Sequence, residues 1–159
     1  MVSHELLVFL IDLAAKLSGY PPMPVDALPP VRLLSEDALA RIVCPQAENG
    51  CTNIAATFET DQYVIYVRDS LDMENAADNS FLLHELVHVL QHRARGDAIF
   101  ADCPTTLKTE TEAYQAQNAY LKREGQFLRF GEALGFMSCA GEQNTFFTRD
   151  IMIDPLIVK

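Results

Sequence analysis

The spacing of apolar residues near the N-terminus predicts an amphipathic helix over residues 5–18. Leucines and alanines recur there every three or four positions, which places them on one side of a helix. The prolines within residues 21–30 cannot continue that helix and favour extended backbone. A short strand over 31–34 is expected next, followed by a helix over 36–43 for which Ser35 offers an N-cap.

Alternating apolar and polar side chains predict two strands in the middle of the chain. Residues 54–59 and 63–68 flank a turn at Thr60 and Asp61, so we expect them to form a hairpin. Alternate residues of the second strand should point to opposite faces of the sheet. Residues 69–78 are polar and hold no sustained period, which predicts a loop.

Helical periodicity dominates the second half of the chain. Asp78 or Asn79 would cap the strongest of these helices at its N-terminus. We expect three helices, at residues 81–95, 107–124 and 127–134, which end at Gly96, Gly125 and Gly135. Residues 141–159 carry no pattern that assigns an element. Helices combined with a hairpin indicate an α+β fold.

Length and charge narrow the classes of protein to which the chain can belong. A chain of 159 residues is the usual size of one domain, so we expect a single domain over 1–159. Its 12 basic and 22 acidic side chains give a net charge of −10, which argues against nucleic acid as a partner. No apolar run reaches the roughly 20 residues of a transmembrane helix. The N-terminal helix lacks a basic segment before its apolar part, so we expect a protein that is not exported or a mature form.

Four cysteines bear on the compartment in which the protein works. Cys44 and Cys51 flank a polar loop that a short disulfide could close, which would leave Cys103 to pair with Cys139. The even count and that loop favour disulfides and a periplasmic or secreted protein. The alternative is four reduced, partly buried thiols in a cytoplasmic protein.

The pentapeptide His-Glu-Leu-Val-His at residues 84–88 is the candidate site. Residues four apart share one face of a helix, so His84 and His88 can direct two imidazoles at one zinc ion. Glu85 lies about 100° round the helix from His84, where it can accept a proton from a water molecule without binding the metal. Apolar flanks predict a buried helix, and burying two histidines with a glutamate is costly unless they have a role.

A catalytic zinc site needs a third protein ligand and leaves one position for water. The metzincin arrangement requires a glycine where Gln91 stands and a histidine where Ala94 stands, so it is excluded. His92 lies about 12 Å along the helix from His84, too far to share its metal, and we interpret it as a surface or core-edge histidine. Gln91 could orient a ligating histidine, or it could be a partly exposed glutamine.

The remaining source of a third ligand is the helix expected at 107–124, which has Glu110 and Glu112 near its start. Its inner face is taken from Ala113, Ala116, Tyr120 and Phe127. Helical rotation places Glu110 about 60° from the centre of that face and Glu112 about 100° from it on the other side. Rotation therefore favours Glu110, with Glu112 as the alternative and Asp97 or Asp102 as a weaker third choice.

The two motifs together resemble a known family. Gluzincins, including the CAAX-prenyl protease type, pair His-Glu-x-x-His with a downstream Glu-x-x-Ala-Asp helix, and this chain has Glu-Thr-Glu-Ala-Tyr at 110–114. The resemblance implies that Glu110 is the third ligand and that Tyr114 replaces an aspartate that orients a histidine. A tyrosine there can form a hydrogen bond or donate to a developing oxyanion. Residues 34–121 also resemble a group of uncharacterised bacterial metallopeptidases.

This resemblance implies a zincin-like fold, with a small antiparallel sheet packed on the metal helix. We expect a zinc-dependent metallopeptidase in which Glu85 is the general base for hydrolysis of a peptide bond. The strand at 63–68 is expected at the edge of the sheet, where an extended peptide could add to it. The alternatives are a zincin-like binding protein with little or no activity and a structural zinc domain.

Overall fold

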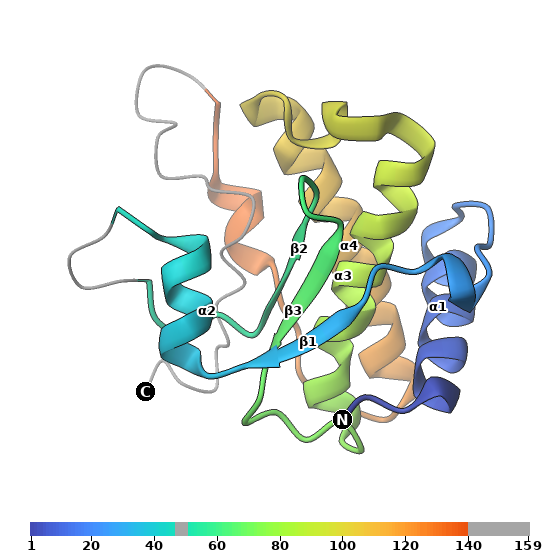
Figure 1. Cartoon of the computed structure of the whole chain (residues 1–159). Helices are drawn as coiled ribbons and strands as arrows, with labels where there is room; N and C mark the ends of the chain where they lie inside the picture. The colour runs from blue at the N-terminus through green and yellow to red at the C-terminus, as the bar shows by residue number, and fades with distance from the viewer. Residues whose placement is uncertain (47–50, 140–159) are drawn as a thin grey trace.

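The computed structural model describes residues 1–46 and 51–139, and they form an α+β fold, as the sequence predicts. Within these residues lie four α-helices and a three-stranded mixed sheet, joined by short 3₁₀ turns (Figure 1). The helices are α1 (His4–Ser18), α2 (Glu36–Val43), α3 (Ala76–Arg95) and α4 (Cys103–Arg123). The strands are β1 (Val31–Leu34), β2 (Ala56–Glu59) and β3 (Val64–Arg68), and the 3₁₀ turns are η1 (Val25–Ala27), η2 (Gly96–Phe100) and η3 (Glu132–Phe136).

The sheet has the order β1-β3-β2, which corrects two expectations. β2 pairs antiparallel with β3, as expected for a hairpin, but β1 pairs parallel with β3, so the sheet is mixed. β3 is the central strand and cannot be the edge strand that the sequence analysis expected at 63–68. The physical reason is burial on both faces. Every residue of β3 is buried, and a strand that is covered on both faces belongs inside a sheet.

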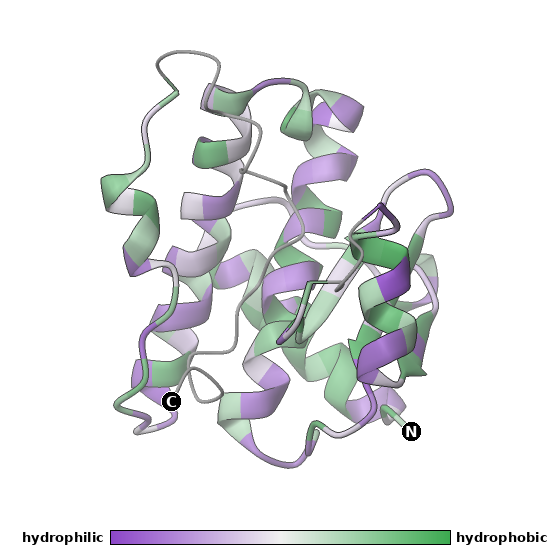
Figure 2. Cartoon of the chain, turned by 90° about the vertical axis from the view of Figure 1, so that its left-hand side faces the viewer, coloured by the Kyte–Doolittle hydropathy of each residue, from purple (hydrophilic) through white to green (hydrophobic). Residues whose placement is uncertain are grey.

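The two faces of β3 enter different parts of the core, as the alternation predicts. Ile65 and Val67 pack in the main cluster, which draws its other residues chiefly from α1, α3 and α4. Val64 and Tyr66 pack with Leu39 of α2 in a smaller cluster. Figure 2 shows hydrophobic and hydrophilic residues alternating along the helices, consistent with helices that bury one side. The sheet therefore lies between α2 and a layer formed by the three longer helices.

The structure confirms the first two helices and moves the start of the third. α1 and α2 are capped by the hydroxyl oxygens of Ser3 and Ser35, which accept backbone N–H groups three residues on. α3 begins at Ala76 rather than at residue 81, because the cap is Asn75 and not Asp78 or Asn79. Residues 76–78, which were expected at the end of a loop, are therefore helical.

The C-terminal part of the described chain differs most from expectation. α4 begins at Cys103, where Asp102 caps it, and Gly125 follows its end with a φ of 70°. The helix expected at 127–134 is wrong, since only the short turn η3 forms there. The side-chain amide of Asn118 pairs with both the N–H and the C=O of Phe130 at 2.9 Å, which ties that segment to α4.

Both disulfides pair as the sequence predicts, Cys44 with Cys51 and Cys103 with Cys139. Disulfides persist in oxidising compartments, so the pairing fits a periplasmic or extracellular location. Among the helices of the described residues, none is long and apolar enough to cross a membrane. Residues 141–159, which carried no prediction, lie outside the part of the chain that the structure describes.

Candidate metal centre

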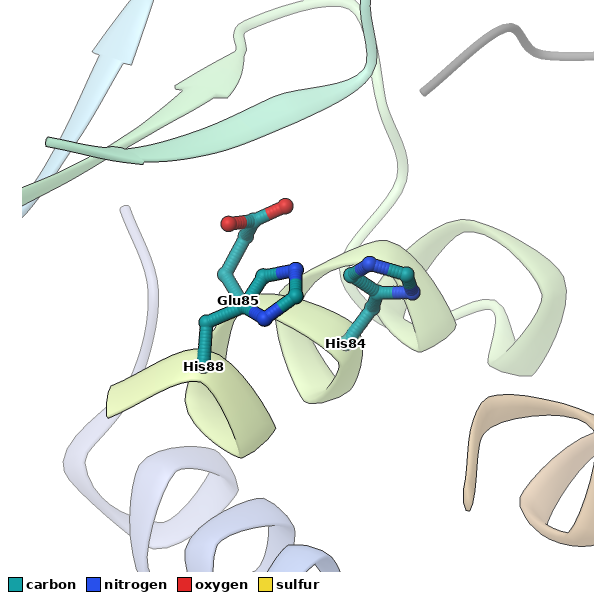
Figure 3. Close-up of side chains that lie close together, drawn as sticks. All are labelled: His84, Glu85 and His88. Atoms are coloured by element: carbon teal, nitrogen blue, oxygen red, sulfur yellow. The ribbon is translucent and has the colours of Figure 1, made fainter. Parts of the chain in front are cut away.

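Helix α3 brings His84, Glu85 and His88 together in the interior of the protein. The three side chains are buried, and one potential ligand atom from each lies within 4.8 Å of the others. Figure 3 shows all three projecting from α3, with Glu85 directed toward the sheet. The four-residue spacing of the histidines on a helix accounts for this convergence.

Helix α4 supplies a carboxylate to the same place. Glu110 Oε2 lies 3.1 Å from His84 Nε2, and Glu110 Oε1 lies 3.3 Å from His88 Nε2. Ligands at 2.0–2.1 Å from a tetrahedral zinc ion stand about 3.3 Å apart, so these separations suit one shared ion. Within the described chain, Glu110 Oε1 has no hydrogen-bond partner of good geometry, although it is buried. The three side chains therefore form a set of donors suited to a metal ion.

The electrostatics of the cluster reflect a carboxylate enclosed with two imidazoles. Burial raises the pKa of Glu110, but the charge of His88 and the close contacts with both imidazoles outweigh it and lower that pKa to about 2. Burial lowers the pKa of His88, but the charge of Glu110 raises it to about 9. For His84, burial is the larger effect and the pKa falls. Glu110 is thus held as an anion beside the imidazole nitrogens.

Two glutamines contact the far sides of the imidazole rings. Gln91 Oε1 lies 2.7 Å from His88 Nδ1, and Gln117 Oε1 lies 2.9 Å from His84 Nδ1. The structure thus confirms that Gln91 contacts a histidine, and it is fully buried rather than partly exposed. The sequence pattern alone gave Gln117 no role. Its signal was a spacing of seven residues from Glu110, which is two helical turns along the same face of α4.

Glu85 is held by the sheet. The backbone N–H of Phe58 in β2 donates a hydrogen bond of 2.7 Å to Glu85 Oε2. This contact fixes one carboxylate oxygen and leaves the side chain beside the two histidines, within the same group of potential ligand atoms. β2, and not the strand at 63–68, therefore borders the candidate site.

The ring of Tyr114 packs against His84. Its ring centroid is 4.4 Å from that of His84, in an edge-to-face arrangement. Burial raises the pKa of Tyr114 well above its usual value, and the charges of Glu110 and Glu85 raise it further. The hydroxyl therefore remains protonated and able to donate. A cavity of about 240 Å³ opens beside Tyr114, between α4 and residues 129–135.

The alternative ligand Glu112 points away from the cluster. Its Oε2 accepts hydrogen bonds from Tyr20 at 2.6 Å, from Gln91 at 2.9 Å and from Arg95 at 3.2 Å. Burial raises the pKa of Glu112, but the hydrogen bonds from Tyr20 and Gln91 and the charge of Arg95 lower it overall. Glu112 is therefore an ionised residue with three donors already in place, and not the solvated helix charge that was its alternative.

The other candidates also have partners outside the cluster. His92 lies 2.9 Å from Asp97 and packs edge-to-face on Phe58, which confirms it as a histidine at the edge of the core. Asp102 accepts the backbone N–H of Thr105 as the cap of α4. Within the described residues, neither aspartate contacts His84 or His88, whereas Glu110 contacts both.

Comparison with known proteins gives a family. No curated protein and no solved structure matches the chain. A family profile does match, over residues 7–132, and this range includes every residue of the cluster from His84 to Gln117. Because the match covers most of the 159 residues, the chain belongs to the family described as "Domain of unknown function (DUF6647)".

Proposed function

We propose that this protein is a zinc-dependent metallopeptidase of the gluzincin type. One observation carries the proposal. The ring nitrogens of His84 and His88 face the carboxylate of Glu110 at 3.1 and 3.3 Å, with Glu85 beside them, in a buried cluster. Two imidazoles and one carboxylate form the ligand set of a catalytic zinc site with one position left for water.

The donor atoms favour zinc over other common cations. Calcium and magnesium prefer oxygen ligands throughout, whereas this cluster offers two imidazole nitrogens. All four cysteines are in disulfides, so no thiolate can complete a closed structural site. Both features support a zinc ion with an open position, rather than a structural zinc domain with four protein ligands.

The roles of the residues follow from their positions. A bound zinc ion would supply a Lewis acid that polarises a carbonyl group and activates water. Glu85 is the general base, and the N–H of Phe58 holds its carboxylate in place while it accepts and returns a proton. The protonated hydroxyl of Tyr114 is the donor that stabilises negative charge developing on the substrate.

The proposed substrate class is a peptide. It rests on the resemblance of the two motifs to gluzincins and on the hydrolytic chemistry of the ligand set. Strand addition to β3 does not support it, since β3 has strands on both sides. The packing of α3 against the sheet, with β2 beside Glu85 and α4 carrying Glu110, supports a zincin-like fold. The two disulfides support a periplasmic or secreted enzyme.

The experiment combines metal content with hydrolysis. Purified protein saturated with zinc and dialysed should retain one equivalent, and it should cleave members of a library of quenched fluorescent peptides. Glu85→Gln should retain the zinc and lose about 10²- to 10⁴-fold in rate, the usual contribution of a general base. Glu74→Gln, at an exposed carboxylate, is the control for loss of charge.

Three results would refute parts of this proposal. Wild-type protein that retains no zinc would remove the metal site. A zinc-loaded protein that cleaves no peptide in the library would favour the inactive binding protein. Cobalt spectra showing four protein ligands and no exchangeable water would favour the structural zinc domain.

A further inference from the structure

Each histidine of the cluster has its Nδ1 atom against the carbonyl oxygen of a glutamine. The separations are 2.7 Å for Gln91 and His88, and 2.9 Å for Gln117 and His84. Both glutamines are 0% exposed, so water cannot replace these contacts. An amide has a donor end and an acceptor end, and its orientation decides which form of the histidine it stabilises.

The surroundings of Gln91 allow only one orientation of its amide. The Nε2 end lies 2.9 Å from the carbonyl oxygen of Thr109 and 2.9 Å from Glu112 Oε2, and both of these atoms are acceptors. A rotated amide would place its oxygen against them and lose two hydrogen bonds. The carbonyl end of Gln91 therefore faces His88. Because a carbonyl oxygen only accepts, His88 must carry a hydrogen on Nδ1.

The surroundings of Gln117 have the same effect through a hydroxyl. Gln117 Nε2 lies 3.0 Å from Ser80 Oγ, and the Ser80 hydroxyl donates its hydrogen to the carbonyl oxygen of Ala77 at 2.6 Å. With that hydrogen used, Ser80 Oγ presents only lone pairs to Gln117. The NH₂ group of Gln117 is therefore the donor, and its carbonyl oxygen accepts from Nδ1 of His84.

We propose that Gln91 and Gln117 are positioning residues that hold both histidines with Nδ1 protonated and Nε2 directed at the metal, and that Glu112 acts on His88 through Gln91. The Nε2 atoms are the ones that face Glu110, at 3.1 and 3.3 Å. Neutral amides fix the rings without drawing the proton toward a carboxylate. The inference rests on the proposed zinc site.

Zinc affinity of substituted proteins tests the inference, measured by competition with a chromophoric chelator. Gln91→Met and Gln117→Met keep the side-chain size and remove the acceptor, and each should weaken zinc binding about 10- to 100-fold. Gln115→Met, at an exposed glutamine of the same helix, should stay within twofold of wild type. Gln117→Glu retains an acceptor for His84 and should recover most of the lost affinity. Glu112→Gln should lose less than tenfold.

Nitrogen-15 NMR of zinc-loaded wild-type protein reads the tautomers directly and needs no variant. We expect both rings to bind zinc through Nε2, with a slowly exchanging hydrogen on Nδ1. In Gln117→Met, the Nδ1 hydrogen of His84 should exchange rapidly with solvent. A purely structural role of Gln117 would change the melting temperature without changing this exchange.

The outcomes separate the inference from the proposed function. If wild-type protein binds zinc and His84→Ala does not, the metal site stands. Affinities within twofold for both Gln→Met proteins, or ligation through Nδ1, would then overturn the positioning role alone. If wild-type protein binds no zinc, the proposed function and this inference both fail.

Discussion

The two sides of α4 hold glutamates with opposite surroundings. Glu110 is buried against the imidazoles of His84 and His88, and one of its oxygens lacks a hydrogen bond within the described chain. Glu112, two residues on, is partly exposed and accepts hydrogen bonds from Tyr20, Gln91 and Arg95. The first carboxylate faces two imidazole nitrogens and could hold a metal ion with them, whereas the second is paired with Arg95 and two neutral donors.

Packing, not residue type, separates the proposed ligand from the residue that supports it. Two residues along a helix is a rotation of about 200°, which sends Glu110 toward the imidazoles of α3 and Glu112 toward Tyr20 and the C-terminal end of α3. Gln91 joins the two sides, because its amide contacts both His88 and Glu112. The inner side would bind the metal, and the outer side would hold one of its histidines in place.

Zinc itself should produce the largest effect. At free zinc about 1,000-fold above Kd, binding adds about 4 kcal/mol to the free energy of unfolding. For a chain of this size, the melting temperature should rise by roughly 8–16 °C. Thermal melts in zinc-buffered solution measure the shift, which should fall to about a third or less in Glu110→Ala and stay at about two thirds or more in Glu112→Ala. An equal shift in both variants would remove the distinction between the two sides of α4.

Direct zinc affinities should separate the same two variants. A four-ligand zinc site gains about 10–16 kcal/mol, or about 3 kcal/mol for each ligand, so Glu110→Ala should lose on the order of 100-fold or more in affinity. Glu112→Ala should lose about tenfold or less, because it removes only a support of Gln91. Chelator competition gives both values. A larger loss in Glu112→Ala would make Glu112 the ligand and Glu110 the support.

Local sequence patterns predicted the residues of the cluster but not the residues that hold them in place. The histidine spacing and the rotation of α4 are properties of single helices, so His84, His88 and Glu110 could be proposed without a fold. The partners of Glu112 come from segments distant in sequence, and Tyr20 is 92 residues away. Periodicity contains no information about such contacts. Gln117 lay within reach, because its spacing from Glu110 places it on the same face.

The errors in the fold have the same origin. The position of β3 between β1 and β2 depends on pairing between Val31 and Ile65, which no local pattern specifies. The helix expected at 127–134 does not form, and the side-chain amide of Asn118 instead forms hydrogen bonds with both the N–H and the C=O of Phe130. Tertiary contacts override local propensity in both places.

A substitution at Gly131, in the segment that packs against Tyr114 of α4, should have an intermediate effect. Gly131 has a φ of 78°, and a Cβ atom there would collide with the ring of Tyr114. Gly131→Ala should therefore cost about 2 kcal/mol in the free energy of unfolding, through overpacking and the left-handed backbone. It should also slow peptide hydrolysis, because it displaces the ring that lies on His84.

Gly125→Ala is the matched control, because Gly125 has a φ of 70° and a Cβ atom there meets no atom within 4 Å. Urea denaturation of the two variants measures the difference. Equal stabilities would show that Tyr114 is free to move, and its position beside His84 would then not depend on the segment that carries Gly131.

The smallest effect should come from the outermost donor to Glu112. Tyr20→Phe removes a hydrogen bond of 2.6 Å to a partly exposed carboxylate and should cost about 1 kcal/mol in the free energy of unfolding. Zinc affinity should change less than threefold, because Gln91 and Arg95 still hold Glu112. Tyr63→Phe, which loses an exposed hydrogen bond of 3.2 Å, is the control. A loss of zinc affinity in Tyr20→Phe as large as that in Gln91→Met would contradict this expectation. It would mean that the orientation of Gln91 depends on Tyr20 as well as on Glu112, so that Tyr20 would also support the metal site.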